Sequence, residues 1–136
     1  MPLKLVLLHR YYLWAYRMRA HLVELGRAPV KTEELRQWSV RTTMYTGMWL
    51  SHLQVVVEGW EKLKLTDATV DALLAAPYKP KLRTLRNALF HFDIKNEGLD
   101  ILALPGIDQV TIEWAAALHD AIGDWFMAMA EPVAIH

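Results

Sequence analysis

Three side chains in the stretch RNALFH, Arg86, Asn87 and His91, are of types that can act on a phosphodiester. Histidine titrates near neutral pH and can accept or donate a proton, while arginine offers paired N–H donors to phosphoryl oxygens as negative charge builds. The asparagine amide can orient either the histidine or the phosphate. These side chains fit the cleavage of RNA, in which the ribose 2′-hydroxyl is the nucleophile and no metal ion is required.

Further cations closely precede this stretch. Lys79, Lys81 and Arg83 lie just before Arg86 in the segment KPKLRTLR. We expect these side chains to converge on a small region and to bind phosphate groups of RNA in a salt-dependent way.

The stretch must be positioned by a helix, which the pattern predicts from Pro80 to about Phe92, with Pro80 in the first turn. At about 100° per residue, the apolar residues share one arc of roughly 80° that can face a bundle. These apolar residues are Leu82, Leu85, Leu89 and Phe92. Arg83, Arg86, Asn87 and His91 form a separate polar face, with His91 close to the helix end.

Helical periodicity also dominates the rest of the chain. It predicts a first helix over 3–25 that ends at Gly26, and a second that begins with Thr32 as N-cap and continues to about Leu65. That segment could be one helix or two, with a bend near Gly47 or Gly59. The remaining predictions are a short helix capped by Thr66 or Asp67, a strand or extended segment over 99–104, and a last helix over 109–129 introduced by Asp108 or Thr111. Residues 1–136 are therefore expected to form a single all-α domain, an up-and-down bundle of four to five helices.

Composition limits the classes of function. The chain has 136 residues and no cysteine, which excludes thiolate metal sites and disulfides and accords with a reducing cytoplasm. No apolar run reaches the roughly 20 residues that a membrane span needs, so we expect a soluble cytoplasmic protein. The net charge is zero, but residues 1–50 hold eight Lys or Arg against three acids, and residues 101–136 hold five acids and no Lys or Arg.

The spelling R-N-x3-H near the end of a helix, in a small all-α domain, resembles the signature motif of the HEPN superfamily. The segments LRTLRNALFHFD and IEWAAALHDAIGDWF are also similar to HEPN-like bacterial and phage-related proteins. The likeness covers about the C-terminal third of the chain. The first eighty residues are similar only in being helical.

The resemblance implies a helical bundle that forms a homodimer and joins two motifs in one cleft. It also implies a metal-independent endoribonuclease that uses RNA as its substrate and needs no cofactor. Such an enzyme would be a toxin or a defence effector, with an antitoxin or another protein as its partner. In such an enzyme Arg86 would stabilise the scissile phosphate, His91 would transfer protons, and Asn87 would support both. Asp93 stands where some toxin branches carry a tyrosine that a nucleotidyltransferase modifies, so the likeness does not extend to that mode of control.

Other roles for these residues stay open. The chain could be a catalytically inactive helical dimer that binds RNA, a nucleotide or a protein partner. Arg86 could form an ion pair with an acid of the last helix, such as Glu113 or Asp120. His119 could line the same groove as the motif, whereas the isolated histidines are expected to be packing or surface residues without a metal. These are His9, His21 and His52. Six tryptophans and a first helix that is apolar over more than half its circumference favour a second subunit.

Overall fold

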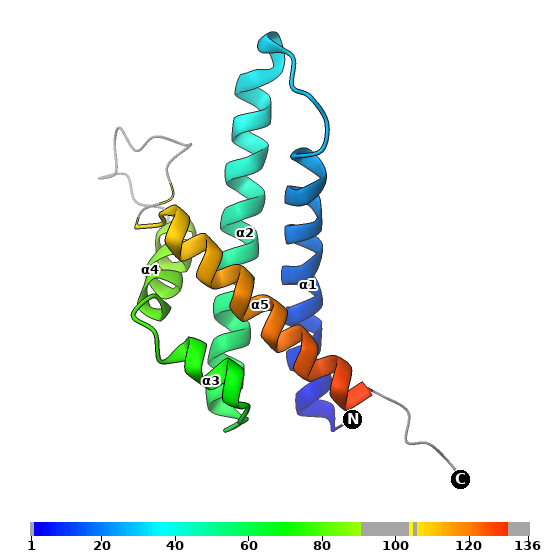
Figure 1. Ribbon diagram of the computed structural model, residues 1–136, viewed down its shortest axis with the longest axis vertical. Helices are drawn as coiled ribbons and strands as arrows, with labels where there is room; N and C mark the ends of the chain where they lie inside the picture. Colours follow the sequence, from blue (N-terminus) through cyan, green and yellow to red (C-terminus); the bar gives the residue numbers. More distant parts are fainter. Residues whose placement is uncertain (1, 91–103, 105, 131–136) are drawn as a thin grey trace.

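The computed structural model describes residues 2–90, 104 and 106–130, and every element in them is helical (Figure 1). His91, Phe92, Asp93 and nearly all of the 99–104 segment lie outside the described residues. Within these residues, five α-helices and one short 3-10 turn follow one another. They are α1 (Leu3–Leu25), the turn η1 (Thr32–Glu34), α2 (Leu35–Lys62), α3 (Ala68–Leu74), α4 (Lys79–Leu89) and α5 (Gln109–Ala130).

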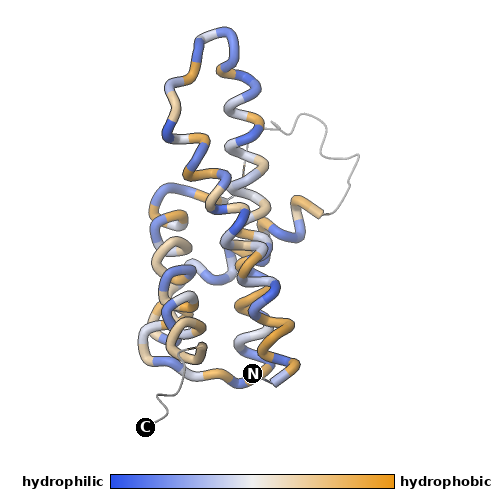
Figure 2. Tube along the Cα trace, turned by 90° about the vertical axis from the view of Figure 1, so that its right-hand side faces the viewer, coloured by the Kyte–Doolittle hydropathy of each residue, from blue (hydrophilic) through white to orange (hydrophobic). Residues whose placement is uncertain are grey.

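Helices α1 and α2 form a long antiparallel hairpin, whose connected end extends beyond the other helices (Figure 1). That end carries mainly hydrophilic residues, while the hydrophobic stretches gather where the helices pack (Figure 2). Helix α1 ends at Gly26, as predicted. It buries the stripe of Leu8, Tyr12 and Ala15 and leaves Leu7 and Trp14 exposed, so much of its apolar surface stays outside the core.

Helix α2 is one continuous helix of 28 residues, about 42 Å long at 1.5 Å per residue. Its glycines are points of close approach to other helices. An added Cβ on Gly47 would meet Leu89 Cδ1 at 2.7 Å, and one on Gly59 would collide with Leu8. The prediction that Thr32 caps this helix is wrong, because Thr32 begins the 3-10 turn and neither η1 nor α2 has a side-chain N-cap hydrogen bond.

The short helix α3 is capped by Asp67, one of the two predicted residues. Its carboxylate accepts hydrogen bonds from the backbone N–H groups of Thr69 and Val70 at 3.1 and 3.0 Å. Two N–H groups that lack a partner within the helix are thereby satisfied.

Helix α4 packs on α2 and carries the motif residues Arg86 and Asn87. Pro80 lies in its first turn, as predicted, and Leu82 and Leu85 are fully buried. Leu89, which we expected to face the bundle, is 39 % exposed even though it lies against Gly47. The helix ends at Leu89, earlier than the predicted end near Phe92.

Helix α5 crosses α1 and α2 obliquely (Figure 1). Asp108 precedes it and accepts hydrogen bonds from the backbone N–H and the hydroxyl of Thr111, which hold the pKa of Asp108 below its ordinary value. The expected up-and-down arrangement therefore holds for the α1–α2 hairpin, whereas α5 lies across it. No helix in the described ranges is long and apolar enough to cross a membrane.

Tryptophan N–H groups connect these helices at several points. The indole of Trp38 donates to the Leu25 carbonyl at 3.0 Å, and that of Trp114 donates to the Leu73 carbonyl at 2.8 Å. The indole of Trp60 donates to Asp71 at 3.2 Å. Trp60 and Trp114 thus fill the core, and the indoles of Trp38 and Trp114 satisfy backbone carbonyl groups near the ends of α1 and α3.

Candidate functional site

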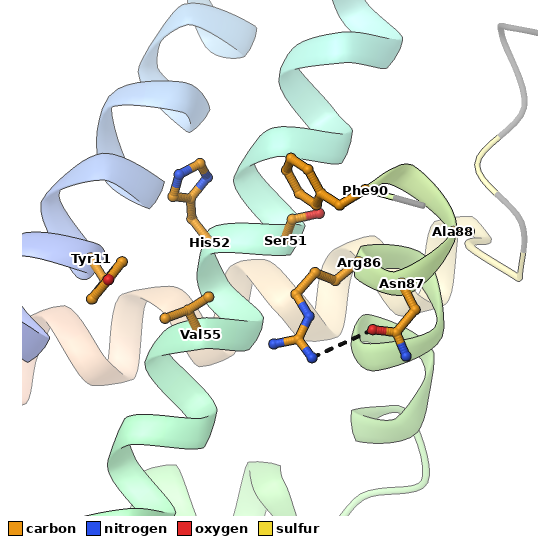
Figure 3. Close-up of a pocket in the computed structure, with 8 residues that line it drawn as sticks. All are labelled: Tyr11, Ser51, His52, Val55, Arg86, Asn87, Ala88 and Phe90. Atoms are coloured by element: carbon orange, nitrogen blue, oxygen red, sulfur yellow. Dashed lines mark hydrogen bonds between the residues drawn. The ribbon is translucent and has the colours of Figure 1, made fainter. Parts of the chain in front are cut away.

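Residues of three helices line an open groove of about 700 Å³ that contains the described part of the motif (Figure 3). The lining comes from α1, α2, α4 and the residue that follows α4. It comprises Tyr11, Ser51, His52, Val55, Arg86, Asn87, Ala88 and Phe90. Aromatic rings, an imidazole, a guanidinium and an amide therefore face the same space.

Arg86 reaches from α4 toward α2 and forms an ion pair there. Its Nη1 lies 2.5 Å from Glu58 Oε1, and its Nη2 donates to Asn87 Oδ1 at 3.5 Å (Figure 3 shows the second bond). The pairing with Glu113 or Asp120, which we considered from the sequence, is wrong, because α4 packs beside α2 with these side chains facing each other. The Asn87 amide therefore contacts the guanidinium, whereas the sequence suggested that it would orient the histidine or the phosphate.

Glu58 holds Arg86 as part of a small network. The same Oε1 accepts from Gln54 Nε2 at 3.1 Å, while the buried Gln54 Oε1 has no hydrogen-bond partner among the described residues. The side chains of Arg86 and Glu58 are 26 and 43 % exposed, so the pair is reached by solvent. A phosphate group that bound Arg86 would therefore compete with a partly hydrated carboxylate.

His52 lies in this groove, although its isolation in the sequence suggested an ordinary packing or surface residue. Its Nδ1 donates to the Met48 carbonyl oxygen at 2.6 Å, because a carbonyl can only accept. In the neutral ring, Nε2 is then the nitrogen without a proton. His52 precedes Glu58 by six residues on α2, about 9 Å along the helix axis.

Nothing in the sequence pattern marked His52, because only the packing of α4 on α2 brings it to the same groove as Arg86. Ser51, its neighbour, was missed for the same reason. The Ser51 hydroxyl is buried and has no hydrogen-bond partner in the part of the chain that the structure describes. Phe90 is 61 % exposed at the groove edge and offers a ring face for stacking.

The three basic residues predicted to lie together, Lys79, Lys81 and Arg83, lie on two different sides of α4. Lys79 pairs with Glu61 at 2.8 Å on the α2 side, where the exposed Arg83 also lies. Lys81 lies on the α5 side instead, 3.7 Å from Asp108. Lys79 and Arg83 therefore extend the polar face of Arg86, whereas the expectation that Lys81 converges with them is wrong. The cause is helical geometry, since residues 79 and 81 are about 200° apart around the axis.

His119 also lies elsewhere than expected. It is 1 % exposed and lines a different groove, between α1 and α5, with Tyr12 and Tyr16. Trp49 Nε1 donates to its Nδ1 at 3.1 Å. Burial, reinforced by the nearby Arg19, lowers the pKa of His119 to about 4, so the ring is neutral near pH 7. His119 is a core residue of the α5 crossing and lies outside the groove of Arg86.

His91, the third motif residue, lies outside the described residues. In the described ranges, no three Asp, Glu or His side chains are grouped so that they could hold a metal ion.

The sequence of this chain matches no protein-family model and no curated protein, and no solved structure matches it either. Membership of the HEPN superfamily therefore stays a prediction from the sequence motif.

Proposed function

We propose that the protein is a HEPN-like, RNA-acting helical domain that cleaves RNA without a metal ion, and that the groove of Arg86 holds the scissile phosphate. The observation that carries the proposal is the groove itself, in which Arg86, Asn87 and His52 share one space with the exposed ring of Phe90. Guanidinium groups bind phosphate, and unstacked RNA bases stack on exposed aromatic rings. This combination favours a single-stranded RNA substrate.

In the proposed reaction the ribose 2′-hydroxyl loses its proton and attacks the adjacent phosphorus. The bond to the 5′-oxygen of the next nucleotide breaks, this oxygen takes up a proton, and the other product ends in a 2′,3′-cyclic phosphate. Arg86 stabilises the charge on the phosphoryl oxygens, and His91 transfers protons, as the motif implies. Asn87 orients the guanidinium, to which it is hydrogen-bonded.

A second candidate is an RNA-binding domain without cleavage activity. The ion pair between Arg86 and Glu58 favours this alternative, because the arginine already has an acceptor and a carboxylate beside the phosphate opposes the build-up of negative charge. The two candidates share the groove and its ligand. The two candidates differ only in whether the phosphodiester bond of the RNA is cleaved.

The proposed enzyme acts as a homodimer. Apolar side chains recur along the outer face of α1 at helical spacing and offer a surface for a second copy, interrupted by Arg10, whose guanidinium lies over the Trp14 ring at 5.3 Å. They are Leu3, Val6, Leu7, Leu13 and Trp14, each at least 42 % exposed. Trp14 makes an edge contact with His52, at 6.0 Å between ring centroids, so this surface reaches the groove.

The decisive experiment is an RNA-cleavage assay with EDTA present throughout. We expect the wild-type protein to cleave single-stranded RNA, and Arg86→Ala and His91→Ala each to lower the rate by about 10²-fold or more, the cost of removing one charge-stabilising or proton-transferring group. Arg36→Ala, at an exposed site near the start of α2, is the matched control and should keep full activity. A 2′-deoxy substitution at the cleaved position should block the reaction.

Binding measured on the same samples separates the two candidates. RNA binding that depends on Arg86, without cleavage, would support the non-catalytic candidate. A protein that neither binds nor cleaves RNA would refute both, and equal cleavage by all variants would identify a contaminating nuclease.

A further inference from the structure

A second groove, of about 380 Å³, lies where α5 crosses the C-terminal half of α1. The buried ring of His119 and the side chain of Tyr12 form part of its lining, together with Tyr16, Arg19, Arg27 and Asp120. None of these residues lines the groove of Arg86. The function proposed above makes no use of this second site.

The imidazole of His119 presents a donor without an acceptor. An indole N–H can only donate, so the bond from Trp49 fixes Nδ1 as the acceptor of a neutral ring and leaves the proton on Nε2. This Nε2 is buried and has no hydrogen-bond partner within the described residues. An unpaired buried donor destabilises the fold, so the position favours a ligand that supplies an acceptor.

Four neighbouring polar side chains, those of Tyr12, Tyr16, Arg19 and Arg27, carry donors, while Glu24 and Asp120 are acceptors. Arg19 is held in place by the face of Trp49, at 5.4 Å, and by Asp120, whose Oδ1 lies 2.6 Å from its Nη1. The Tyr12 hydroxyl keeps its proton at neutral pH, because burial, more than the neighbouring charge of Asp120, raises its pKa to about 12. Arg27 adds an exposed positive charge at the rim, against the negative charge of Glu24 there.

Arg19 already binds one oxyanion, the carboxylate of Asp120. This carboxylate is 65 % exposed, so it can be displaced at little cost. The Tyr16 ring stacks on His119 at 6.1 Å between centroids and is 55 % exposed, whereas Tyr12 and Trp49 are buried. Tyr16 is therefore the exposed side chain whose rotation would uncover one face of the His119 ring.

We propose that this groove binds a small oxyanion, a carboxylate or phosphate group, which accepts from His119 Nε2 with one oxygen and from Arg19 with another, in place of Asp120. The neutral imidazole and the charged guanidinium provide donors from α5 and α1. The ligand would thus connect these two helices at their crossing.

Titration of the wild-type protein with sodium phosphate and, separately, with sodium acetate tests this proposal, with sodium chloride at matched ionic strength as reference. The signals to follow are the indole N–H of Trp49 and the imidazole nitrogens of His119 in ¹⁵N spectra, because Trp49 reports on the opposite nitrogen of the same ring. We expect a saturable shift with phosphate, acetate or both, and none with chloride. A response to only one anion identifies the chemical source of the ligand.

Two variants sharpen the test. Arg19→Met keeps the hydrocarbon stem and should weaken binding about tenfold or more, the value of a charge-assisted hydrogen bond. Arg17→Met, at an exposed position on the same helix, is the matched control and should leave the affinity unchanged. Asp120→Asn removes the competing carboxylate and should strengthen binding. The proposal is overturned if neither anion gives a saturable shift in the wild type, or if Arg19→Met responds as the wild type does.

Discussion

The ion pair between Arg86 and Glu58 affects how strongly the groove of Arg86 can bind a phosphate group. Arg86 lies on the short helix α4 and Glu58 on α2, and both side chains reach solvent. Exposed ion pairs contribute about 0–1 kcal/mol to stability, so a phosphate with two charge-assisted bonds to the guanidinium can replace the carboxylate. The ion pair therefore fixes the position of the Arg86 side chain in the groove. It also weakens the attraction of Arg86 for RNA.

Glu58→Gln tests how strongly Glu58 competes with RNA for Arg86. The substitution keeps the hydrogen bonds that an amide can make and removes the negative charge, so we expect the affinity for single-stranded RNA to rise about threefold to fivefold, the equivalent of up to about 1 kcal/mol. The free energy of unfolding should fall by no more than about 1 kcal/mol. Fluorescence anisotropy with labelled RNA and urea unfolding measure the two effects.

Glu61→Gln is the matched control for this experiment. It removes the same charge one helical turn further along α2, where Glu61 pairs with Lys79 instead of Arg86. A gain in affinity that is equal in both variants would mean that only the overall charge of the protein matters, and would contradict a specific role for Glu58.

His119 makes the stability of the fold depend on pH. Its pKa is about 4 in the folded protein and near the ordinary value of 6.5 in the unfolded chain. The unfolded state therefore binds more protons between these values, and the free energy of unfolding should fall as the pH drops from 6.5 to 4, by up to about 3 kcal/mol. Urea unfolding at several pH values between 7 and 4 measures this loss.

His119→Gln should remove most of that pH dependence, because an amide oxygen can accept the Trp49 N–H bond without titrating in this range. His21→Gln, which changes a histidine outside this cluster, is the control and should retain the pH dependence of the wild type. If His119→Gln loses stability with falling pH as steeply as the wild type, the carboxylates are responsible and the prediction is wrong.

Glycines determine how closely the helices can approach one another. At Gly123 on α5, an added Cβ would collide with the hydroxyl of the buried Tyr12, so this residue allows α5 to lie across α1. Gly59 similarly admits Leu8 to the surface of α2. The oblique crossing of α5 and the tight α1–α2 hairpin thus both depend on a missing side chain.

We expect Gly123→Ala to lower the free energy of unfolding by about 1–3 kcal/mol, because overpacking outweighs the gain in helix propensity of about 1 kcal/mol. Gly26→Ala is the control. An added Cβ there meets nothing closer than 3.5 Å, and φ is −79°, so its effect should stay within about 0.5 kcal/mol. Thermal or urea unfolding, followed by circular dichroism, measures both effects. A Gly123→Ala protein that is more stable than the wild type would contradict the close contact between Gly123 and Tyr12.

For the molecule as a whole, the outer face of α1 is the feature that the fold leaves uncovered. Leu3 is 73 % exposed and Trp14 44 %, and Trp14 contacts His52, which lines the Arg86 groove. Contiguous exposed apolar surface is uncommon in monomers and typical of interfaces. A homodimer that buried this face would also bring the grooves of two subunits toward the same interface.

Sedimentation measurements should accordingly give about twice the 15.7 kDa mass of one chain for the wild type at micromolar concentration. Trp14→Glu places a charge on this face and should shift the protein to a monomer, by roughly a hundredfold or more in the dissociation constant. Glu33→Ala, in the exposed turn η1, is the control and should remain dimeric. A wild type that sediments as a monomer would exclude this interface.

Several helix boundaries could be predicted from the sequence. The end of α1 at Gly26, the cap of α3 at Asp67 and the start of α5 after Asp108 depend on interactions between residues a few positions apart. Hydrophobic periodicity and capping chemistry report such interactions directly. The sequence also predicted that Arg86 and Asn87 would share a polar face.

The ion-pair partner of Arg86 and the hydrogen-bond partner of His119 could not be predicted from the sequence, because they lie on other helices. Glu58 precedes Arg86 by 28 residues and reaches it because α4 packs beside α2, and the same packing adds His52 to the groove. His119 faces Tyr12 and Trp49 because α5 lies obliquely across the hairpin. Crossing angles depend on how side chains from distant segments fit together, and periodicity within one segment carries no information about that fit.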